Sequence, residues 1–255
     1  MSRENPKALF ILMVGALTGL GVFMVLSAGP FSLSKAGPNF FIPVRHYLYI
    51  VIGIIVAVIV SQMDYRIWKK WAFLMFLCAI VLLVLVLIVG VEVRGARRWL
   101  RLGPLSFQPS DFARFALIVF LASGFSAKEQ FGVKNEAALL AALGLVVLLV
   151  LLEPNFGTAM MLLVIGFLLF FWGGMRLSLL VLPLLLAVVM GVVGYFAFPH
   201  VRGRIHDYVE GLCGDPTPQV ARAKIALGCG GITGVGLGKG QEKMFYLPDP
   251  HTDFM

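Results

Sequence analysis

Charged residues are scarce in this sequence of 255 residues. They make up 13% of it, against about 25% in a typical soluble domain. Hydrophobic residues make up 60%, and the mean hydropathy is +0.93. A soluble domain of this length cannot bury so much apolar side chain, so the composition excludes a soluble enzyme and a disordered protein. Three cysteines are also too few for a secreted disulfide scaffold.

The apolar residues form continuous runs without the two-residue alternation of barrel strands, which predicts membrane-spanning helices. Seven runs are predicted to span the membrane: Ala8–Ala28, Tyr47–Ser61, Ala72–Gly90, Phe112–Phe125, Ala137–Leu152, Phe156–Trp172 and Leu177–Phe198. The predicted fold is therefore an all-α polytopic bundle over residues 1–198. An odd number of spans places residues 199–255 on the side opposite the N-terminus.

A nucleotide-binding loop is also missing. Residues 228–240 are rich in glycine, but a Walker A loop needs glycine where Thr233 stands and Ser or Thr where Gly240 stands. We interpret this segment as a flexible loop at a membrane surface. Nothing in the sequence predicts a nucleic-acid partner.

The first candidate motifs lie between the third and fourth spans. Residues 95–99 (Gly-Ala-Arg-Arg-Trp) precede residues 108–114 (Gln-Pro-Ser-Asp-Phe-Ala-Arg). Pro109 suits the first turn of a helix, and Asp111 and Arg114 are spaced to pair on one helix face. Two interpretations stay open: an interfacial helix start with snorkelling arginines, or a cationic anchor for a phosphate group.

Two further motifs contain acidic residues. Residues 153–158 (Glu-Pro-Asn-Phe-Gly-Thr) predict a tight reversal between two spans, because Pro154 interrupts a continuous helix. Charged groups at the membrane are functional candidates, although a capped turn explains the motif equally well. Residues 247–254 (Leu-Pro-Asp-Pro-His-Thr-Asp-Phe) gather acidic residues and a histidine, which a solvated loop also explains.

These four motifs, with the last extended from Lys224-Ile-Ala to Phe254, resemble the SEDS family, the FtsW, RodA and SpoVE group of bacterial cell-wall polymerases. Their order and spacing match over essentially the whole chain. Residues 241–254 are closer to the division members, FtsW, than to the elongation members, RodA. The family usually has Glu and Lys where this chain has Asp111 and Arg114, and Gln-Pro-Asp where it has Glu153-Pro154-Asn155.

The resemblance implies a peptidoglycan glycosyltransferase that polymerises lipid II at the outer face of the cytoplasmic membrane during cell division. Asp253 aligns with the acidic residue proposed as catalytic in the family, where it would act as a general base on the acceptor hydroxyl. The candidate substrate-binding residues are Arg98, Arg114, Lys224, Asp111, Gln108, Glu153, His251 and Lys239. Arg98, Arg114 and Lys224 fall within matching motifs as candidate pyrophosphate ligands, whereas Arg101 and Lys239 are candidates from charge and side alone. These cations could act with or without a divalent metal, so Mg or Mn is a candidate cofactor, with no ligand set evident from the sequence.

The resemblance also implies partners and a topology. The expected partners are lipid II, a class B penicillin-binding protein transpeptidase and other division proteins. Family members have ten spans, three of them after the His-Thr-Asp-Phe motif. The expectation is therefore a fragment with seven helices and an incomplete extracytoplasmic loop over residues 199–255, inactive alone.

The distribution of charge bears on orientation. A cytoplasmic N-terminus, as in the family, puts the larger share of Lys and Arg outside, against the positive-inside rule. An anionic substrate at the outer face accounts for this excess. The alternative function is a lipid II flippase or another transporter of lipid-linked precursors, but the predicted spans lack the charged groups of a transport route.

Overall fold

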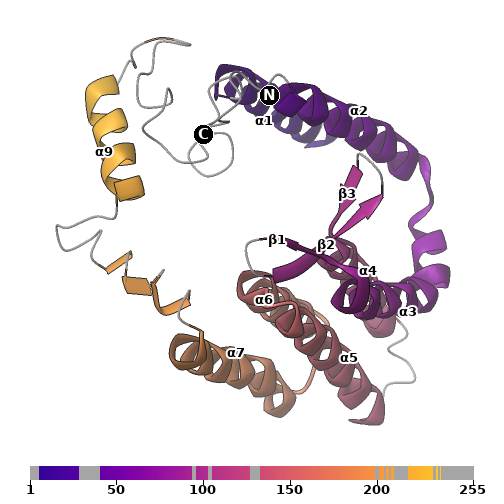
Figure 1. Ribbon diagram of the computed structural model, residues 1–255. Helices are drawn as coiled ribbons and strands as arrows, with labels where there is room; N and C mark the ends of the chain where they lie inside the picture. Colours follow the sequence, from indigo (N-terminus) through magenta and orange to yellow (C-terminus); the bar gives the residue numbers. More distant parts are fainter. Residues whose placement is uncertain are drawn as a thin grey trace, which may run out of the picture. The chain divides into compact units, whose positions relative to one another are not determined.

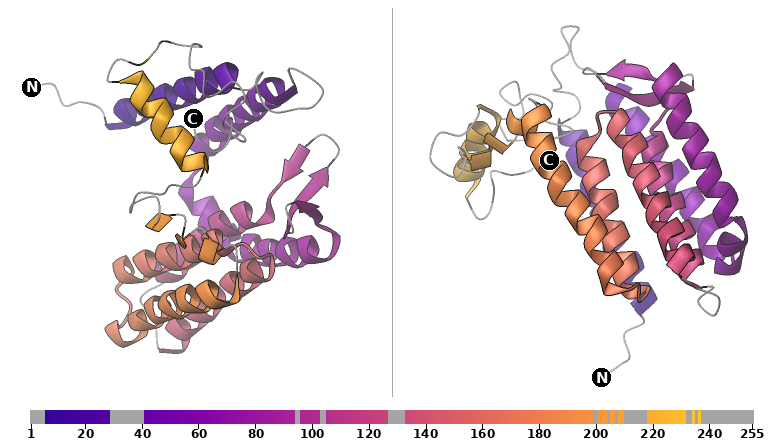
Figure 2. Two further views of the ribbon diagram at one scale, coloured as in Figure 1. Left: turned by 60° about the vertical axis from the view of Figure 1, so that its left-hand side comes forward. Right: turned by 90° about the horizontal axis from the view of Figure 1, so that it is seen from below.

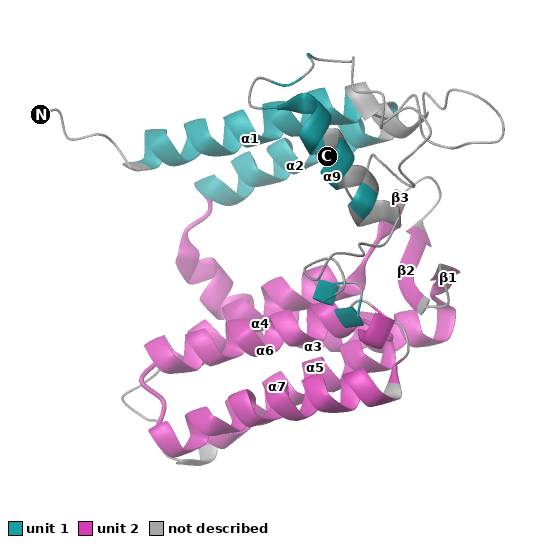
Figure 3. Cartoon of the chain, turned by 90° about the vertical axis from the view of Figure 1, so that its left-hand side faces the viewer, with its two compact units in different colours: residues 1–62, 204–255 teal, residues 63–203 magenta. Residues whose placement is uncertain are grey.

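The computed structural model describes residues 6–28, 41–93, 96–102, 105–126, 133–198, 201–203, 205–206, 208–209, 218–231, 234 and 236. The chain divides into two compact units, one of residues 1–62 with 204–255 and one of residues 63–203 (Figure 3). The predicted division into a bundle over residues 1–198 and a loop over residues 199–255 stays a prediction.

The first unit contains the helices α1 (Pro6–Ala28), α2 (Phe41–Gln62) and α9 (Pro218–Gly230). α1 packs beside α2. The apolar side chains of α1 are largely exposed, for example Phe10 at 69% and Leu17 at 70%. Because water penalises an apolar surface of this extent, this helix suits a lipid environment.

The second unit is a helical bundle that carries a small sheet (Figure 1). Its helices are α3 (Tyr65–Val89), α4 (Pro109–Ser126), α5 (Val133–Leu152), α6 (Phe156–Trp172) and α7 (Leu177–Ala197). The side chain of Asp64 caps α3 by accepting a hydrogen bond from the main-chain N–H of Arg66 at 3.0 Å. α4 begins at Pro109, as predicted, because the fixed φ of proline suits a first helical turn.

The core of this unit follows from helical periodicity. The buried residues of α3 recur every three or four positions, so they share one face; they are Ala72, Phe76, Ala79, Leu83 and Val86. The face packs on α4, where the small Ala113 and Ala116 are fully buried. Phe76 stacks on Phe120 with ring centroids 4.3 Å apart. α5 lies close to α6 because Gly166 leaves space for the side chain of Leu143.

The sheet was not predicted. Its strands β1 (Val91–Val93), β2 (Ala96–Leu102) and β3 (Leu105–Phe107) pair antiparallel in the order β1-β2-β3. Figure 2 (right) shows the sheet at one end of the helices. Two residues separate each pair of neighbouring strands, and each connection contains a glycine, Gly95 or Gly103. That spacing is a hairpin signal that could have revealed the sheet.

Each of the seven predicted spans coincides with one of the helices α1 to α7, with Gly90 and Phe198 one residue beyond α3 and α7, which confirms them as helices. Four helical stretches are long and apolar enough to cross a membrane: Lys7–Leu26, Tyr65–Val89, Asn135–Leu152 and Leu177–Phe196. The apolar stretches His46–Gln62 and Phe156–Trp172 are shorter. Large apolar side chains also face outward from the second unit, including Phe73 at 67% and Phe196 at 78% exposed. These features define a multi-pass helical membrane protein.

Candidate functional site

The candidate site lies at one end of the second unit. We call this the hairpin end, which consists of strands β1 to β3, residues 108–114 at the start of α4 and the turn at residues 153–155 between α5 and α6. Three of the predicted motifs meet there, although up to about 60 residues separate them along the chain. Antiparallel helices bring the end of α3, the start of α4 and the α5–α6 turn to the same level.

Arg98 of β2 connects the sheet to the α5–α6 turn. Its Nε donates a hydrogen bond to the main-chain oxygen of Glu153 at 3.1 Å, and its Nη2 donates to the main-chain oxygen of Pro154. Carbonyl groups at the C-terminus of a helix lack partners within the helix, and a guanidinium satisfies two of them at once. Two donors of Arg98 therefore hold the fold of the site.

Ser110 is a second point of attachment. It lies in the first turn of α4 and is fully buried. Its Oγ accepts hydrogen bonds from Nε2 of Gln108 at 2.9 Å and from Nδ2 of Asn155 at 3.5 Å. The sequence singled out Gln108 but missed Ser110 and Asn155 as linked groups, because residues 45 positions apart give no periodic signal. This contact ties α4 to the α5–α6 turn.

Asp111 and Arg114 pair on the surface of α4, as predicted from their spacing. Nη2 of Arg114 lies 3.2 Å from Oδ1 of Asp111, and their side chains are 28% and 59% exposed. Asp111 is in the first helical turn, where the helix dipole favours a negative charge. Arg114 thus presents a cation beside the sheet, with its charge partly neutralised by Asp111.

Glu153 is an acidic side chain buried at the hairpin end. It is fully buried, and neither carboxyl oxygen has a hydrogen-bond partner among the described residues. It lies in the turn after α5, outside the membrane-spanning segments. Burial raises the pKa of Glu153 to about 8, and the nearby positive charge of Arg98 opposes that rise. Glu153 is therefore largely protonated at neutral pH.

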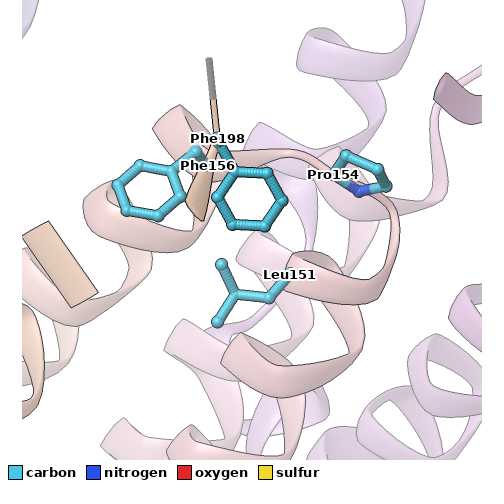
Figure 4. Close-up of a pocket in the computed structure, with 4 residues that line it drawn as sticks. All are labelled: Leu151, Pro154, Phe156 and Phe198. Carbon is cyan, nitrogen blue, oxygen red and sulfur yellow. The ribbon is translucent and has the colours of Figure 1, made fainter. Parts of the chain in front are cut away.

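An apolar depression lies directly beside these polar groups. Leu151, Pro154, Phe156 and Phe198 line this shallow depression, which encloses no space large enough for a water molecule (Figure 4). The rings of Phe156 and Phe198 are 6.1 Å apart and bring the end of α7 against the start of α6. Polar groups next to an apolar surface suit a ligand with a charged head and an apolar tail.

The structure brings five of the predicted site residues to the hairpin end. They are Arg98, Gln108, Asp111, Arg114 and Glu153. Lys224 is exposed on α9 in the other unit. Lys239, His251 and Asp253 lie outside the described residues. The assignment of these last four to one site stays a prediction.

The described residues contain no group of three His, Cys, Asp or Glu side chains that could hold a metal ion. The acidic residues nearest the predicted base lie outside the described part of the chain. No step of the chemistry below depends on a metal.

The geometry defines a class of protein: a multi-pass helical membrane protein with a polar, cationic site at one end of its bundle. The chain belongs to the FtsW, RodA and SpoVE family of cell cycle proteins, whose sequence pattern matches residues 7–255. It is 35% identical to a probable peptidoglycan glycosyltransferase FtsW of Trichlorobacter lovleyi, over 96% of this chain and 66% of that protein. It is 33% identical to stage V sporulation protein E of Bacillus subtilis, over 99% of this chain and 71% of that protein.

Two solved structures show the same fold. RodA of Thermus thermophilus matches 71% of this chain and 57% of its own, with a TM-score of 0.61 and 28% identity. A peptidoglycan synthase complex matches 85% of this chain and 62% of its own, with a TM-score of 0.64 and 27% identity. The chain thus spans about two thirds of the curated relatives and less of the solved structures.

Proposed function

We propose that this chain is part of a peptidoglycan glycosyltransferase that polymerises lipid II during cell division. The observation that carries the proposal is the hairpin end, where three family motifs form one cationic, polar site beside an apolar depression. The relatives named peptidoglycan glycosyltransferases support the same reaction. Lipid II has a pyrophosphate head, which suits the cationic groups of this site, and a polyprenyl tail, which suits the exposed apolar surface of the helices.

In the proposed reaction, a sugar 4-hydroxyl attacks the anomeric carbon of lipid II and lipid pyrophosphate leaves. Asp253 takes the proton of the attacking hydroxyl as a general base. Pyrophosphate is a good leaving group, so it needs charge stabilisation more than protonation. Arg114 of α4 and the exposed Arg101 of β2 are the candidate cations of the hairpin end for this task, and Lys224 and Lys239 are further candidates. Arg98 has a supporting role, because two of its donors hold the α5–α6 turn.

The proposal includes a location and partners. The hairpin end faces the outside of the bacterial cytoplasmic membrane, and the N-terminus is cytoplasmic. A class B penicillin-binding protein transpeptidase is the proposed protein partner, in line with the similarity to a peptidoglycan synthase complex. The proposal includes a divalent cation, Mg or Mn, whose ligands are not assigned.

The test is a lipid II polymerisation assay on the protein purified as its gene encodes it. Asp253→Asn keeps the shape of the side chain but cannot accept a proton at neutral pH. We expect polymer formation to fall by about 100-fold, the scale of general-base loss, with lipid II binding little changed. Asp249→Asn is the matched control, since it removes a carboxylate four residues away.

Near-normal polymerisation by Asp253→Asn would remove Asp253 as the base. An equal loss in Asp249→Asn would indicate a diffuse acidic loop instead of one catalytic carboxylate. Movement of lipid II across a vesicle membrane without any polymer would overturn the polymerase proposal in favour of a transporter.

A further inference from the structure

Glu153 poses a physical problem that the proposed reaction does not explain. Its side chain is fully buried, and both carboxyl oxygens lack a hydrogen-bond partner within the described residues. An ionised carboxylate in such a place loses its hydration without compensation, which is among the most costly arrangements in a folded protein. A neutral carboxylic acid loses far less.

Arg98 does not resolve this problem through a hydrogen bond to the carboxyl group. Its Nε and Nη2 donate to the main-chain oxygens of Glu153 and Pro154, with Nε 3.1 Å from the former. Those bonds fix the turn that carries Glu153. If the carboxyl group were ionised, it would attract the same guanidinium in a low-dielectric surrounding, in competition with the two carbonyl groups.

The other charged groups at the hairpin end either pair with one another or are exposed. From α4, Asp111 and Arg114 pair with each other. From the sheet, Arg97 lies 3.9 Å from Glu92, with both side chains more than half exposed, and Arg101 is exposed. The adjoining ends of α3, α5, α6 and α7 carry no other charged residue in their described sequence. Arg98 is therefore the charged neighbour that acts on Glu153 in the described part of the chain.

We propose that Glu153 is a positioning residue that works as a neutral carboxylic acid. In its protonated form, it leaves Arg98 on the two carbonyl groups, so that the turn, the sheet and the start of α4 keep their arrangement. In its ionised form, it draws the guanidinium off those carbonyl groups and loosens the hairpin end. The effect on polymerisation rests on the proposed function, whereas the effect on stability does not.

The direction of the pH dependence follows from linkage. Burial raises the pKa of Glu153 from 4.5 to about 8, and Arg98 opposes the rise. Between these two values the folded chain keeps a proton that the unfolded chain has lost, so rising pH favours unfolding. The loss of stability begins near pH 4.5, grows through this window and levels off above about pH 8.

The first experiment measures melting temperature in detergent from pH 4 to 9 for the wild type, Glu153→Gln and Glu136→Gln. Glutamine keeps the shape and stays neutral, so Glu153→Gln should match the wild type near pH 4 and melt at a higher temperature near pH 8. Glu136, a part-buried glutamate at the opposite end of the bundle, is the control, and its variant should keep the decline of the wild type. Parallel curves for the wild type and Glu153→Gln would overturn the proposal.

A spectroscopic measurement covers the case in which Glu153→Gln does not fold. The infrared carbonyl stretch of a protonated carboxylic acid should be present in the wild type at pH 7 and disappear as the pH rises past about 8. Glu153→Met removes the carboxyl group without a charge and should lack this band. A wild-type spectrum without the band at pH 7 would also contradict the proposal.

The second experiment measures polymerisation of lipid II against pH. At pH 9, one unit above a pKa of about 8, about one tenth of the wild type would keep the neutral carboxyl group. The wild type should therefore lose about tenfold in activity between pH 7 and 9 relative to Glu153→Gln. Equal alkaline losses would overturn the positioning role. If neither protein forms polymer at any pH, the proposed function fails, and the melting curves still decide the state of Glu153.

Discussion

The two ends of the second unit differ in how deeply their polar and charged side chains are buried. At the end opposite the sheet, Nζ of Lys69 donates to the exposed Oγ of Ser126 at 2.8 Å, and the exposed side chain of Arg176 lies 3.9 Å from the part-buried Glu136. At the hairpin end, Ser110, Glu153 and Asn155 are buried. Exposed pairs contribute little to stability, whereas buried polar groups are costly unless satisfied. The opposite end therefore resembles an interfacial anchor, whereas the hairpin end has the buried polar groups of a functional site.

The largest expected effect comes from Arg98→Ala, with Arg176→Ala as its counterpart at the other end. Loss of Arg98 leaves two main-chain carbonyl groups at the α5–α6 turn without their donor. We expect the free energy of unfolding to fall by about 3 kcal/mol. The melting temperature in detergent should then fall by roughly 6–12 °C.

Arg176→Ala removes a long ion pair, 3.9 Å between an exposed guanidinium and a part-buried carboxylate, and should cost about 1 kcal/mol. Equal melting temperatures for Arg98→Ala and Arg176→Ala would show that the two ends contribute equally to stability. A smaller loss in Arg98→Lys than in Arg98→Ala would show that charge alone restores part of the contact.

Short-range sequence features predicted the helices, their boundaries and the ion pair within α4. Continuous apolar runs give the helices α1 to α7, Pro109 begins α4, and Pro154 separates α5 from α6. The pairing of Asp111 with Arg114 follows from helical spacing alone. These features are encoded within a few residues, so a single sequence suffices to predict them.

Contacts between residues far apart in the sequence could not be predicted in this way. Nothing in the sequence indicates that Arg98 donates to carbonyl groups 55 and 56 residues away, or that Ser110 contacts Asn155. The burial of Glu153 likewise depends on tertiary packing around the α5–α6 turn, where Arg98 of β2 is attached. The sheet itself was predictable from two glycine-containing connections, but the apolar composition drew attention to helices alone.

Gly194→Ala tests how tightly α7 packs on Phe156 beside the hairpin end. Gly191→Ala, one turn earlier in the same helix, is the matched control. A Cβ atom at Gly194 would lie 2.2 Å from Cζ of Phe156, whereas a Cβ atom at Gly191 would meet nothing within 4 Å. Both changes gain the same helix propensity. We expect Gly194→Ala to lose about 2 kcal/mol through overpacking and Gly191→Ala to be neutral or slightly stabilising.

Melting curves and the fluorescence of an environment-sensitive label near Phe198 measure this effect. A stable Gly194→Ala variant with unchanged label fluorescence would mean that Phe156 moves freely. In that case the apolar depression beside Glu153 would not be a fixed feature of the hairpin end.

The smallest expected effect compares two serines. Ser110→Ala removes a buried acceptor for Gln108 and Asn155, whereas Ser126→Ala removes an exposed acceptor for Lys69. A buried donor left without a partner costs about 1–2 kcal/mol, and Lys69 can turn to water instead. Ser110→Ala should therefore lower the melting temperature by roughly 2–8 °C, and Ser126→Ala by less than about 2 °C.

Because Ser110 ties α4 to the α5–α6 turn, amide exchange in that turn should also quicken in Ser110→Ala and stay unchanged in Ser126→Ala. Unchanged exchange at residues 153–158 in Ser110→Ala would show that Arg98 alone holds the turn.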